Sequence, residues 1–225
     1  MGHLTTSYLK AETKIPSEQM GNSLVLSGPD RGGHIFRLLA VVLCSCSIPV
    51  TLTAQEQEMK VVVDFTEGEG VLWSIVNDGV MGGRSTSKIS VTDERTALFK
   101  GFVSLENNGG FASTRAAFQS LDLSAYEGVI LKVKGDGRRY QLRFRQDGKF
   151  DGVAYGVEFK TTPGEWTEVD LPFDTFQATF RGYVPRGSGP LDPTRIRQMA
   201  ILIGDDKEGQ FALEIDWVKA YRTSR

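Results

Sequence analysis

Residues 128–146 read GVILKVKGDGRRYQLRFRQ, and this stretch decides the fold class. Apolar residues alternate with polar ones on both sides of its centre, at Val129, Leu131 and Val133 and again at Tyr140, Leu142 and Phe144. A period of two is typical of a β-strand with one buried face. Asp136-Gly137 favours a tight turn, because this pair tolerates positive φ angles. The stretch therefore predicts two antiparallel strands joined as a hairpin.

The same pattern recurs along the chain at short intervals, separated by Gly, Asp, Asn and Pro. The expected strands lie at 60–65, 97–105, 110–118, 128–136, 138–146, 152–160 and 165–173, with closing strands at 199–205 and 209–222. One helix of a turn or two is expected in DPTRIRQM (192–199), after its Asp-Pro start. The fold class indicated is all-β, an antiparallel β-sandwich or jelly roll.

The composition excludes several classes of protein. The chain has 225 residues and a formal net charge of −2, which argues against disorder and against nucleic-acid binding through bulk charge. His3, His34, Cys44 and Cys46 all precede residue 55. Catalysis by Ser–His or Cys–His, structural zinc and disulfide bonds are therefore excluded from the rest of the chain. We expect no catalytic residues, no metal ligands and no cofactor.

The N-terminal 54 residues differ from the rest. Residues 1–33 are polar and unpatterned and are expected to form a disordered extension or a long n-region, with Met20 as an alternative start. Residues 34–54 follow a basic, apolar, small order that is typical of a signal peptide cleaved after Ala54, which predicts an exported protein. Alternatives are an uncleaved anchor helix and lipid attachment at Cys46. The acidic residues before position 34 argue against a mitochondrial presequence, but a mitochondrial location is the alternative to export.

The stretch VNDGVMGGRSTS (76–87) is rich in glycine and has no core-forming pattern. A phosphate-binding loop needs Lys and a hydroxyl residue after its last glycine, followed by a helix, and neither condition is met here. Asn77 and Asp78 favour an Asx-type turn before Gly79. The loop is interpreted either as a structural turn or as the rim of a binding site.

Basic side chains occupy the faces opposite the apolar ones in 128–146. Arg139, Arg143 and Arg145 alternate on one strand, and Lys132 and Lys134 on the other. If the two strands form a hairpin, these residues share one sheet surface. Such a surface is either a solvated face with interleaved acids or a platform for an acidic partner.

Carboxylates offer two further hypotheses. Glu214 and Asp216 point to one face of a strand, as the paired acids of a glycoside hydrolase would require, although their surroundings do not resemble a catalytic site. The turn GDDKEG (204–209) has oxygen ligands suited to Ca²⁺ or to simple solvation. The long segment 183–190, YVPRGSGP, has the length of a functional loop.

Several blocks together resemble the complex I intermediate-associated protein 30 family. These blocks include WSIVNDGVMGGRSTS, GFVSLENNGGFASTR and PGEWTEVDLPFDTFQATFRG, and the resemblance covers about residues 60–222. It implies a galactose-binding-like β-sandwich over residues 58–225. It also implies a binding activity rather than catalysis, since mitochondrial members are assembly chaperones for respiratory complex I.

The resemblance and the charged residues together give the candidate site. The expected partner- or ligand-binding residues are Asn77, Asp78, Arg84, Arg115, Arg139, Arg143, Arg145 and Arg181. Polar side chains are costly to bury alone, so they either satisfy one another or face a ligand. We expect Asp78 to pair with Arg115 or Arg181 and to order the rim of a shallow site.

Three functions compete at this point. The first is a protein-binding assembly factor or chaperone, with an assembly intermediate as partner and membrane association only through the N-terminal segment. The second is an exported carbohydrate-binding module of the cell envelope, for which exposed tryptophans would be required. Trp166 and Trp217 lie in strong strand patterns and are expected in the core. The third is a hydrolase that uses carboxylates alone.

Overall fold

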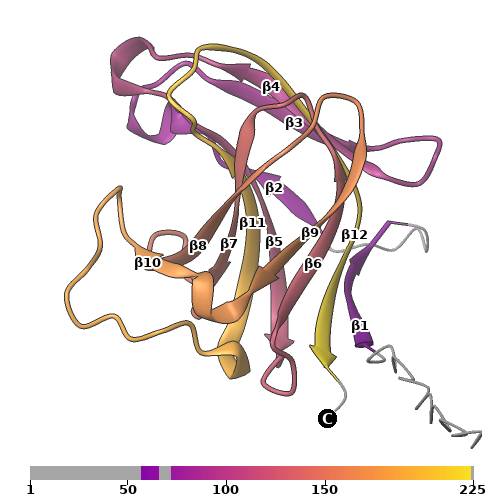
Figure 1. The fold of residues 1–225 in the computed structure, drawn as a ribbon. Coiled ribbons are helices and arrows are strands. Elements are labelled where there is room, and N and C mark those ends of the chain that lie inside the picture. Colours follow the sequence, from indigo (N-terminus) through magenta and orange to yellow (C-terminus); the bar gives the residue numbers. More distant parts are fainter. Residues whose placement is uncertain (1–56, 66–71, 224–225) are drawn as a thin grey trace, which may run out of the picture. The chain divides into compact units, whose positions relative to one another are not determined.

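The computed structural model describes residues 57–65 and 72–223, which form two antiparallel β-sheets packed as a sandwich (Figure 1). The predicted all-β fold is therefore confirmed. The chain divides into two units, Met1–Thr51 and Leu52–Arg225, and every described residue belongs to the second. The expected extension (1–33) and the expected signal or anchor segment (34–54) lie outside the described residues. Within those residues, no helix is both long and apolar enough to cross a bilayer.

The first sheet, here called sheet A, has the strand order β3-β4-β12-β6-β9, and β1 also pairs with β12. Its strands are β1 (Gln57–Asp64), β3 (Thr86–Val91), β4 (Ala97–Val103), β6 (Gly128–Lys134), β9 (Trp166–Pro172) and β12 (Gly209–Thr223). β12 is long enough for one edge to pair with β4 along its first half and with β1 along its second half. All these pairs are antiparallel.

The second sheet, sheet B, has the order β10-β8-β7-β11-β5-β2. Its strands are β2 (Trp73–Ile75), β5 (Ala112–Leu121), β7 (Arg139–Arg145), β8 (Ala154–Lys160), β10 (Gln177–Thr179) and β11 (Ile196–Ile203). Four 3₁₀ turns are described between strands: η1 (Asp78–Met81), η2 (Glu106–Asn108), η3 (Phe173–Thr175) and η4 (Pro193–Arg195). The last of these is the short helix expected after Asp192, whose carboxylate accepts a hydrogen bond from the Thr194 amide.

The core lies between the two sheets and is built from the alternating apolar faces. Leu131 and Leu213 point inward from sheet A, and Leu142 and Ile201 point inward from sheet B. The ring of Phe211 packs edge-on against Tyr140 across the sandwich, with ring centroids 6.5 Å apart. Fully burying a large apolar side chain stabilises a fold by about 1.5–3 kcal/mol, so the many such residues supply most of the driving force.

The expected hairpin of residues 128–146 is wrong, although both of its strands are present. β6 pairs with β12 and β9, whereas β7 pairs with β11 and β8, so the connection between them crosses from sheet A to sheet B. Gly137 has a φ of +90°, as the Asp-Gly turn predicts. The carboxylate of Asp136 fixes the crossing by accepting hydrogen bonds from the Arg138 amide, the Tyr140 hydroxyl and the Ala212 amide.

This crossing divides the expected basic platform between two faces. Lys132 and Lys134 lie on sheet A and form ion pairs with Asp216 and Glu214, at 2.8 and 2.6 Å. Arg139, Arg143 and Arg145 lie on sheet B instead. Periodicity alone assigned each residue to the correct strand. It could not show that two consecutive strands of a sandwich can belong to different sheets, as β6 and β7 do.

The tryptophans Trp166 and Trp217 were expected in the core, and this expectation is also wrong. Trp166 is 37% exposed, and Trp217 is half-buried on the outer face of sheet A. A register shift between Ile215 and Trp217 lets two successive residues of β12 face outward. The ammonium group of Lys134 lies 4.8 Å from the Trp166 ring centroid, and that of Lys219 lies 4.1 Å from the ring of Trp217.

Candidate functional site

Two loops meet at one end of the sandwich, residues 76–85 between β2 and β3 and residues 104–111 between β4 and β5 (Figure 1). Asp78 lies between them with no exposed surface. One carboxylate oxygen accepts the Ser85 amide at 2.9 Å. The other accepts the Ser85 hydroxyl at 2.5 Å and the amides of Gly110 and Phe111 at 2.7 and 3.3 Å. Asp78 therefore holds both loops through donors that lie far apart in the sequence.

Asn77 supports the same junction from the neighbouring position. Its side-chain oxygen accepts hydrogen bonds from the Ser87 hydroxyl at 2.8 Å and the Ser113 amide at 3.3 Å. Its amide nitrogen donates to the Ser85 carbonyl at 3.4 Å. Because these partners come from β3, β5 and the loop, Asn77 ties the loop to both sheets.

The expected pairing of Asp78 with Arg115 or Arg181 is wrong. Burial raises the pKa of Asp78, but the hydrogen bonds from Ser85, Gly110 and Phe111 outweigh burial and hold the pKa below its usual range. Four donors satisfy the carboxylate without a cation. Arg115 and Arg181 contact Phe150 and Asp151 instead.

The lowered pKa predicts a loss of stability in acid. A group with a depressed folded-state pKa contributes stability above its unfolded pKa, near 3.8, and loses it as the pH falls through the folded value. The free energy of unfolding should therefore be level near neutral pH and fall below about pH 4. Urea unfolding at several pH values measures this. Asp78→Asn should show a smaller loss between pH 5 and pH 3 than the unchanged chain, and equal slopes would contradict the assignment.

The tip of the first loop exposes apolar side chains, although its base is fixed. Val80 and Met81 are 61% and 60% exposed, and Leu105 on the second loop is 45% exposed. Arg84 and Glu106 form an ion pair at 2.8 Å between the loops. The Asn107 side chain donates to the Gly82 carbonyl, which adds a further link.

The remaining candidate arginines separate into two sets. Arg139 pairs with Glu158 at 3.4 Å and Arg181 pairs with Asp151 at 2.5 Å, both at exposed positions. Surface pairs of this kind contribute about 0–1 kcal/mol. The second set, Arg115, Arg143 and Arg145, lies on the outer face of sheet B. The residues predicted as one site therefore lie in separate places. Asn77, Asp78 and Arg84 lie at the two loops, whereas Arg115, Arg143 and Arg145 lie on the outer face of sheet B.

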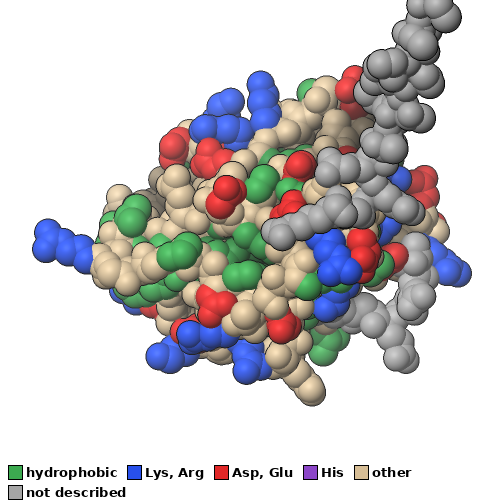
Figure 2. All heavy atoms as spheres, turned by 60° about the horizontal axis from the view of Figure 1, so that its bottom comes forward, with side chains coloured by type: hydrophobic (Ala, Val, Ile, Leu, Met, Phe, Trp, Pro, Cys, Tyr) green, Lys and Arg blue, Asp and Glu red, His purple; other side chains and the backbone are tan. Residues whose placement is uncertain are grey.

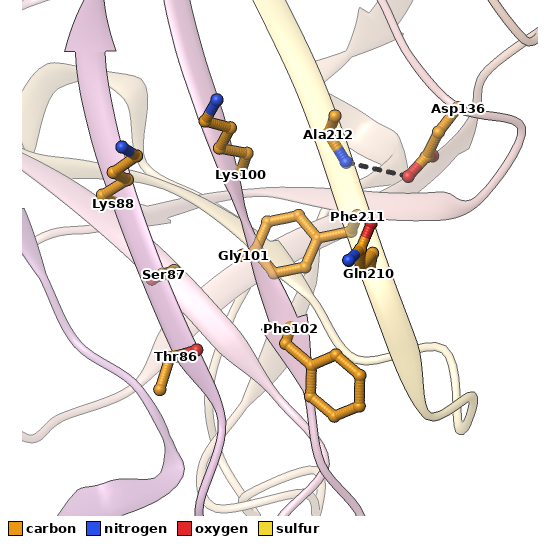
Figure 3. Close-up of a pocket in the computed structure, with 10 residues that line it drawn as sticks. All are labelled: Thr86, Ser87, Lys88, Lys100, Gly101, Phe102, Asp136, Gln210, Phe211 and Ala212. Carbon is orange, nitrogen blue, oxygen red and sulfur yellow. Dashed lines mark hydrogen bonds between the residues drawn. The ribbon is translucent and has the colours of Figure 1, made fainter.

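A broad hollow of about 690 Å³ crosses β3, β4 and β12, which the sequence did not indicate (Figure 3). Lys88 and Lys100 are directly opposite each other in the register of β3 and β4. Phe102, 40% exposed, lies one pleat further along. Like charges in opposed positions are unfavourable by about 0.2–1 kcal/mol. The hollow is open and combines cations with apolar surface.

Four of the carboxylates considered for catalysis or calcium, Asp205, Glu208, Glu214 and Asp216, are engaged in structural contacts. Asp205 forms an ion pair with Arg138 at 2.5 Å, and Glu214 binds Lys134 and the Thr96 hydroxyl. Burial raises the pKa of Asp205, but the hydrogen bond and the charge of Arg138 lower it by more. The pKa of Asp205 is therefore below its usual value. Every described carboxyl group with a shifted pKa is shifted downward. A general acid needs the opposite shift.

The site residues that the sequence missed are Val80 and Ser85 above all. Ser85 is buried and supplies two of the four hydrogen-bond donors to Asp78. Val80-Met81 was visible as an apolar pair inside a glycine-rich loop, which is an unusual place for large side chains. On the face shown in Figure 2, acidic and basic side chains lie around hydrophobic ones.

The comparisons with solved structures support the fold. A family 11 carbohydrate-binding module of the Clostridium thermocellum cellulase Lic26A-Cel5E superposes with a TM-score of 0.56 at 21% identity, covering 72% of this chain and 94% of the module. The same module in complex with a β-1,3-1,4-mixed-linked tetrasaccharide gives a TM-score of 0.54 at 21% identity, with 75% and 96% covered. This likeness is one of fold.

Sequence relatives are closer. The mitochondrial complex I intermediate-associated protein 30 of Mus musculus is 30% identical to this chain, and the match covers 73% of this chain and 57% of the relative. Its Drosophila melanogaster counterpart, also named mitochondrial, is 27% identical, and the match covers 72% of this chain and 62% of the relative. The chain thus spans about three-fifths of the length of these relatives. The family model described as complex I intermediate-associated protein 30 matches residues 63–215, more than half of the sequence. The chain therefore belongs to the complex I intermediate-associated protein 30 family.

Proposed function

We propose that this chain is a non-catalytic, protein-binding assembly factor that docks its partner through the tip of the 76–85 loop. The observation that carries the proposal is the contrast within this loop. Asp78 is fully buried and fixes the base, yet Val80 and Met81 expose about three-fifths of their surface. Large apolar side chains held outward on a rigid support are typical of interface anchors, and a preorganised loop loses little entropy on binding.

The neighbouring contacts extend this docking surface. Leu105 adds apolar area from the second loop, and the Arg84–Glu106 pair provides a polar rim. Met81 is flexible and polarisable, which suits contact with an irregular partner surface. An apolar centre with a charged rim is the usual anatomy of a protein–protein interface.

Two further features favour binding over catalysis. No His or Cys follows residue 46. Asp78 near the loops and Asp205 and Glu208 in the 204–209 turn are used as hydrogen-bond acceptors or ion-pair partners. By the names of its relatives, the partner is an intermediate of respiratory complex I, and the site of action is mitochondrial rather than exported. An exported location remains a second proposal, which rests on residues 34–54 alone.

Replacing the loop tip tests the docking surface. Val80→Ser combined with Met81→Gln should reduce recovery of the partner at least tenfold, because interface anchors contribute about 2 kcal/mol or more each. The free energy of unfolding should change by no more than about 0.5 kcal/mol, since both side chains are already solvated. The measurement is quantitative affinity capture from the native source with the full chain as bait.

Val91→Ser is the matched control, because Val91 is 64% exposed on β3 and lies outside the two loops. Its capture should equal that of the unchanged chain. If the unchanged chain recovers complex I subunits and the Val80→Ser, Met81→Gln variant does not, the assembly role is supported. Equal recovery by the loop variant and the control would exclude the loop as the docking surface.

A carbohydrate-binding module is the second candidate, and one observation favours it: Trp166 and Trp217 face outward from sheet A. Stacking on sugar rings needs free aromatic faces. Here lysine ammonium groups lie over both rings, and neither tryptophan lines the hollow on β3, β4 and β12. Recovery of polysaccharide in the capture experiment would favour this candidate over a protein partner.

A further inference from the structure

Three arginines lie close together on the outer face of sheet B. Arg115 on β5 and Arg143 on β7 are both opposite Ala200 on the intervening strand β11. Neighbouring strands are about 4.8 Å apart, so the two backbones are separated by about 10 Å. Arg145 follows two residues after Arg143, on the same face of β7, opposite Gln198. The small residues Ala200, between Arg115 and Arg143, and Gly156, on the other side of Arg143, leave space next to the arginine side chains.

The three guanidinium groups are held by neutral acceptors. Arg115 donates to the Phe150 carbonyl at 2.7 Å, and its guanidinium lies 5.2 Å from the centroid of the Phe150 ring. Arg143 donates twice to the side-chain oxygen of Gln141, at 2.8 and 2.6 Å. Arg145, only 8% exposed, donates to the Gly152 carbonyl. Among the described residues none of the three has a carboxylate within 4.0 Å.

Their charges are therefore only partly balanced. Burial, with the neighbouring arginines, lowers the pKa of Arg115 and of Arg143 to about 10, which still leaves both charged at neutral pH. Three carboxylates lie nearby, but Glu158 is taken up by Arg139 and Asp151 by Arg181. Asp147 acts on Arg145 from a distance. Partly desolvated like charges without ion-pair partners favour an external anion.

A small hollow adjoins this cluster. It is open to solvent, has a volume of about 240 Å³, and is lined by residues that include Arg115, Ser74, Ala117, Phe150 and Gln198, together with the 90%-exposed Leu72. The lining combines one cation, two amide or hydroxyl groups and apolar side chains. This volume admits an acidic side chain, and its apolar part suits the methylene groups of a glutamate.

We propose that the face formed by Arg115, Arg143 and Arg145 binds an acidic peptide segment of a partner protein, with one carboxylate at Arg115 and a second at Arg143. In an extended peptide, residues two apart lie on the same face about 7 Å apart, so two glutamates at this spacing can both face the sheet. Their flexible side chains and those of the arginines cover the remaining distance to strands about 10 Å apart. Bidentate guanidinium–carboxylate pairs give both strength and orientation. A nucleic acid fits less well, because Asp147, Asp151 and Glu158 would repel a continuous line of phosphates. The inference concerns a second surface, so it can fail while the docking through Val80 and Met81 holds, and the reverse.

The test uses the full chain and fluorescein-labelled ten-residue peptides. One peptide carries glutamate at positions 4 and 6, which share a face of an extended chain, in an otherwise alanine- and serine-based sequence, and its match carries glutamine at both. Fluorescence anisotropy at low salt should give at least about tenfold tighter binding of the glutamate peptide, since hydrogen bonds to charged groups dominate the difference. Added salt should weaken it.

Variants assign the binding to this face. Arg115→Gln and Arg143→Gln should each weaken binding of the glutamate peptide about tenfold, and the pair together should reduce it to the level of the glutamine peptide. Arg143→Lys should recover part of the loss, which separates charge from folding. Arg222→Gln, which removes an exposed ion pair with Glu58 on sheet A, is the matched control and should leave binding unchanged.

Several outcomes overturn the proposal. They are equal binding of the two peptides, no detectable binding at millimolar peptide, and a loss with Arg222→Gln as large as with Arg143→Gln. A labelled single-stranded oligonucleotide of ten nucleotides that binds more tightly, and with the same dependence on Arg115 and Arg143, would reassign the face to nucleic acid.

Discussion

Replacing Asp78 by alanine should lower the free energy of unfolding by about 3–5 kcal/mol, because buried donors left without an acceptor cost about 1–3 kcal/mol each. The substitution removes the acceptor for two donors of Ser85 and for the amides of Gly110 and Phe111. A domain of this size has a total stability of about 5–15 kcal/mol, so the variant would be marginal. Urea unfolding and thermal melting measure the change, with an expected drop in Tm of about 10 °C.

Asp78→Asn is the graded control. It keeps one acceptor oxygen but places an amide donor against other donors, so it should cost less than alanine. A change below about 1 kcal/mol for alanine would show that the two loops are held by other contacts. The pairing with Arg115 or Arg181 expected from the sequence would instead predict a loosened loop and an intact sandwich.

Gly83→Ala should be the second most damaging change, for a steric reason. A Cβ at Gly83 would lie 2.4 Å from the Asp78 Cγ and 2.6 Å from one of its carboxylate oxygens. The carboxylate cannot move away without losing its donors. Overpacking of this kind costs about 1–3 kcal/mol, and the lost hydrogen bonds add to it.

Gly79→Ala provides the comparison within the same loop. A Cβ at Gly79 meets no atom within 4 Å, and its backbone has no positive φ. That variant should match the unchanged chain within about 0.5 kcal/mol or be slightly more stable, because alanine restricts the unfolded chain. Equal destabilisation by both substitutions, in parallel urea unfolding curves, would disprove the steric account of the glycine-rich motif.

The sequence predicted the strands well because periodicity reports on burial. Every expected strand from 60–65 to 209–222 is present within a few residues. The short strands β2 and β10 were not predicted, since three residues are too few for a period. The six-residue strand β3 was not predicted either, and it has no fully buried residue. The crossing between β6 and β7 was misassigned because Asp-Gly specifies a turn, whereas the partners of each strand are set by long-range packing.

The sequence identified several polar residues of the candidate site but not the partners that they contact. Asn77 and Asp78 were identified as costly to bury alone, and both are indeed satisfied. Their partners are backbone amides and serine hydroxyls, which leave almost no trace in a sequence. The burial of Arg145 and the exposure of Met81 depend on how β7 and the loop meet the rest of the fold. Local pattern carries no information of that kind.

The central claim is that the 76–85 loop is a rigid support whose tip meets a protein partner. Its most direct test is site-specific photo-cross-linking in the native source, with a photoreactive residue at position 81 of the full chain and, separately, at position 91. The account predicts that position 81 cross-links to a defined protein and that position 91 does not. Cross-linking of the same proteins from both positions, or of glycan alone from position 81, would contradict it.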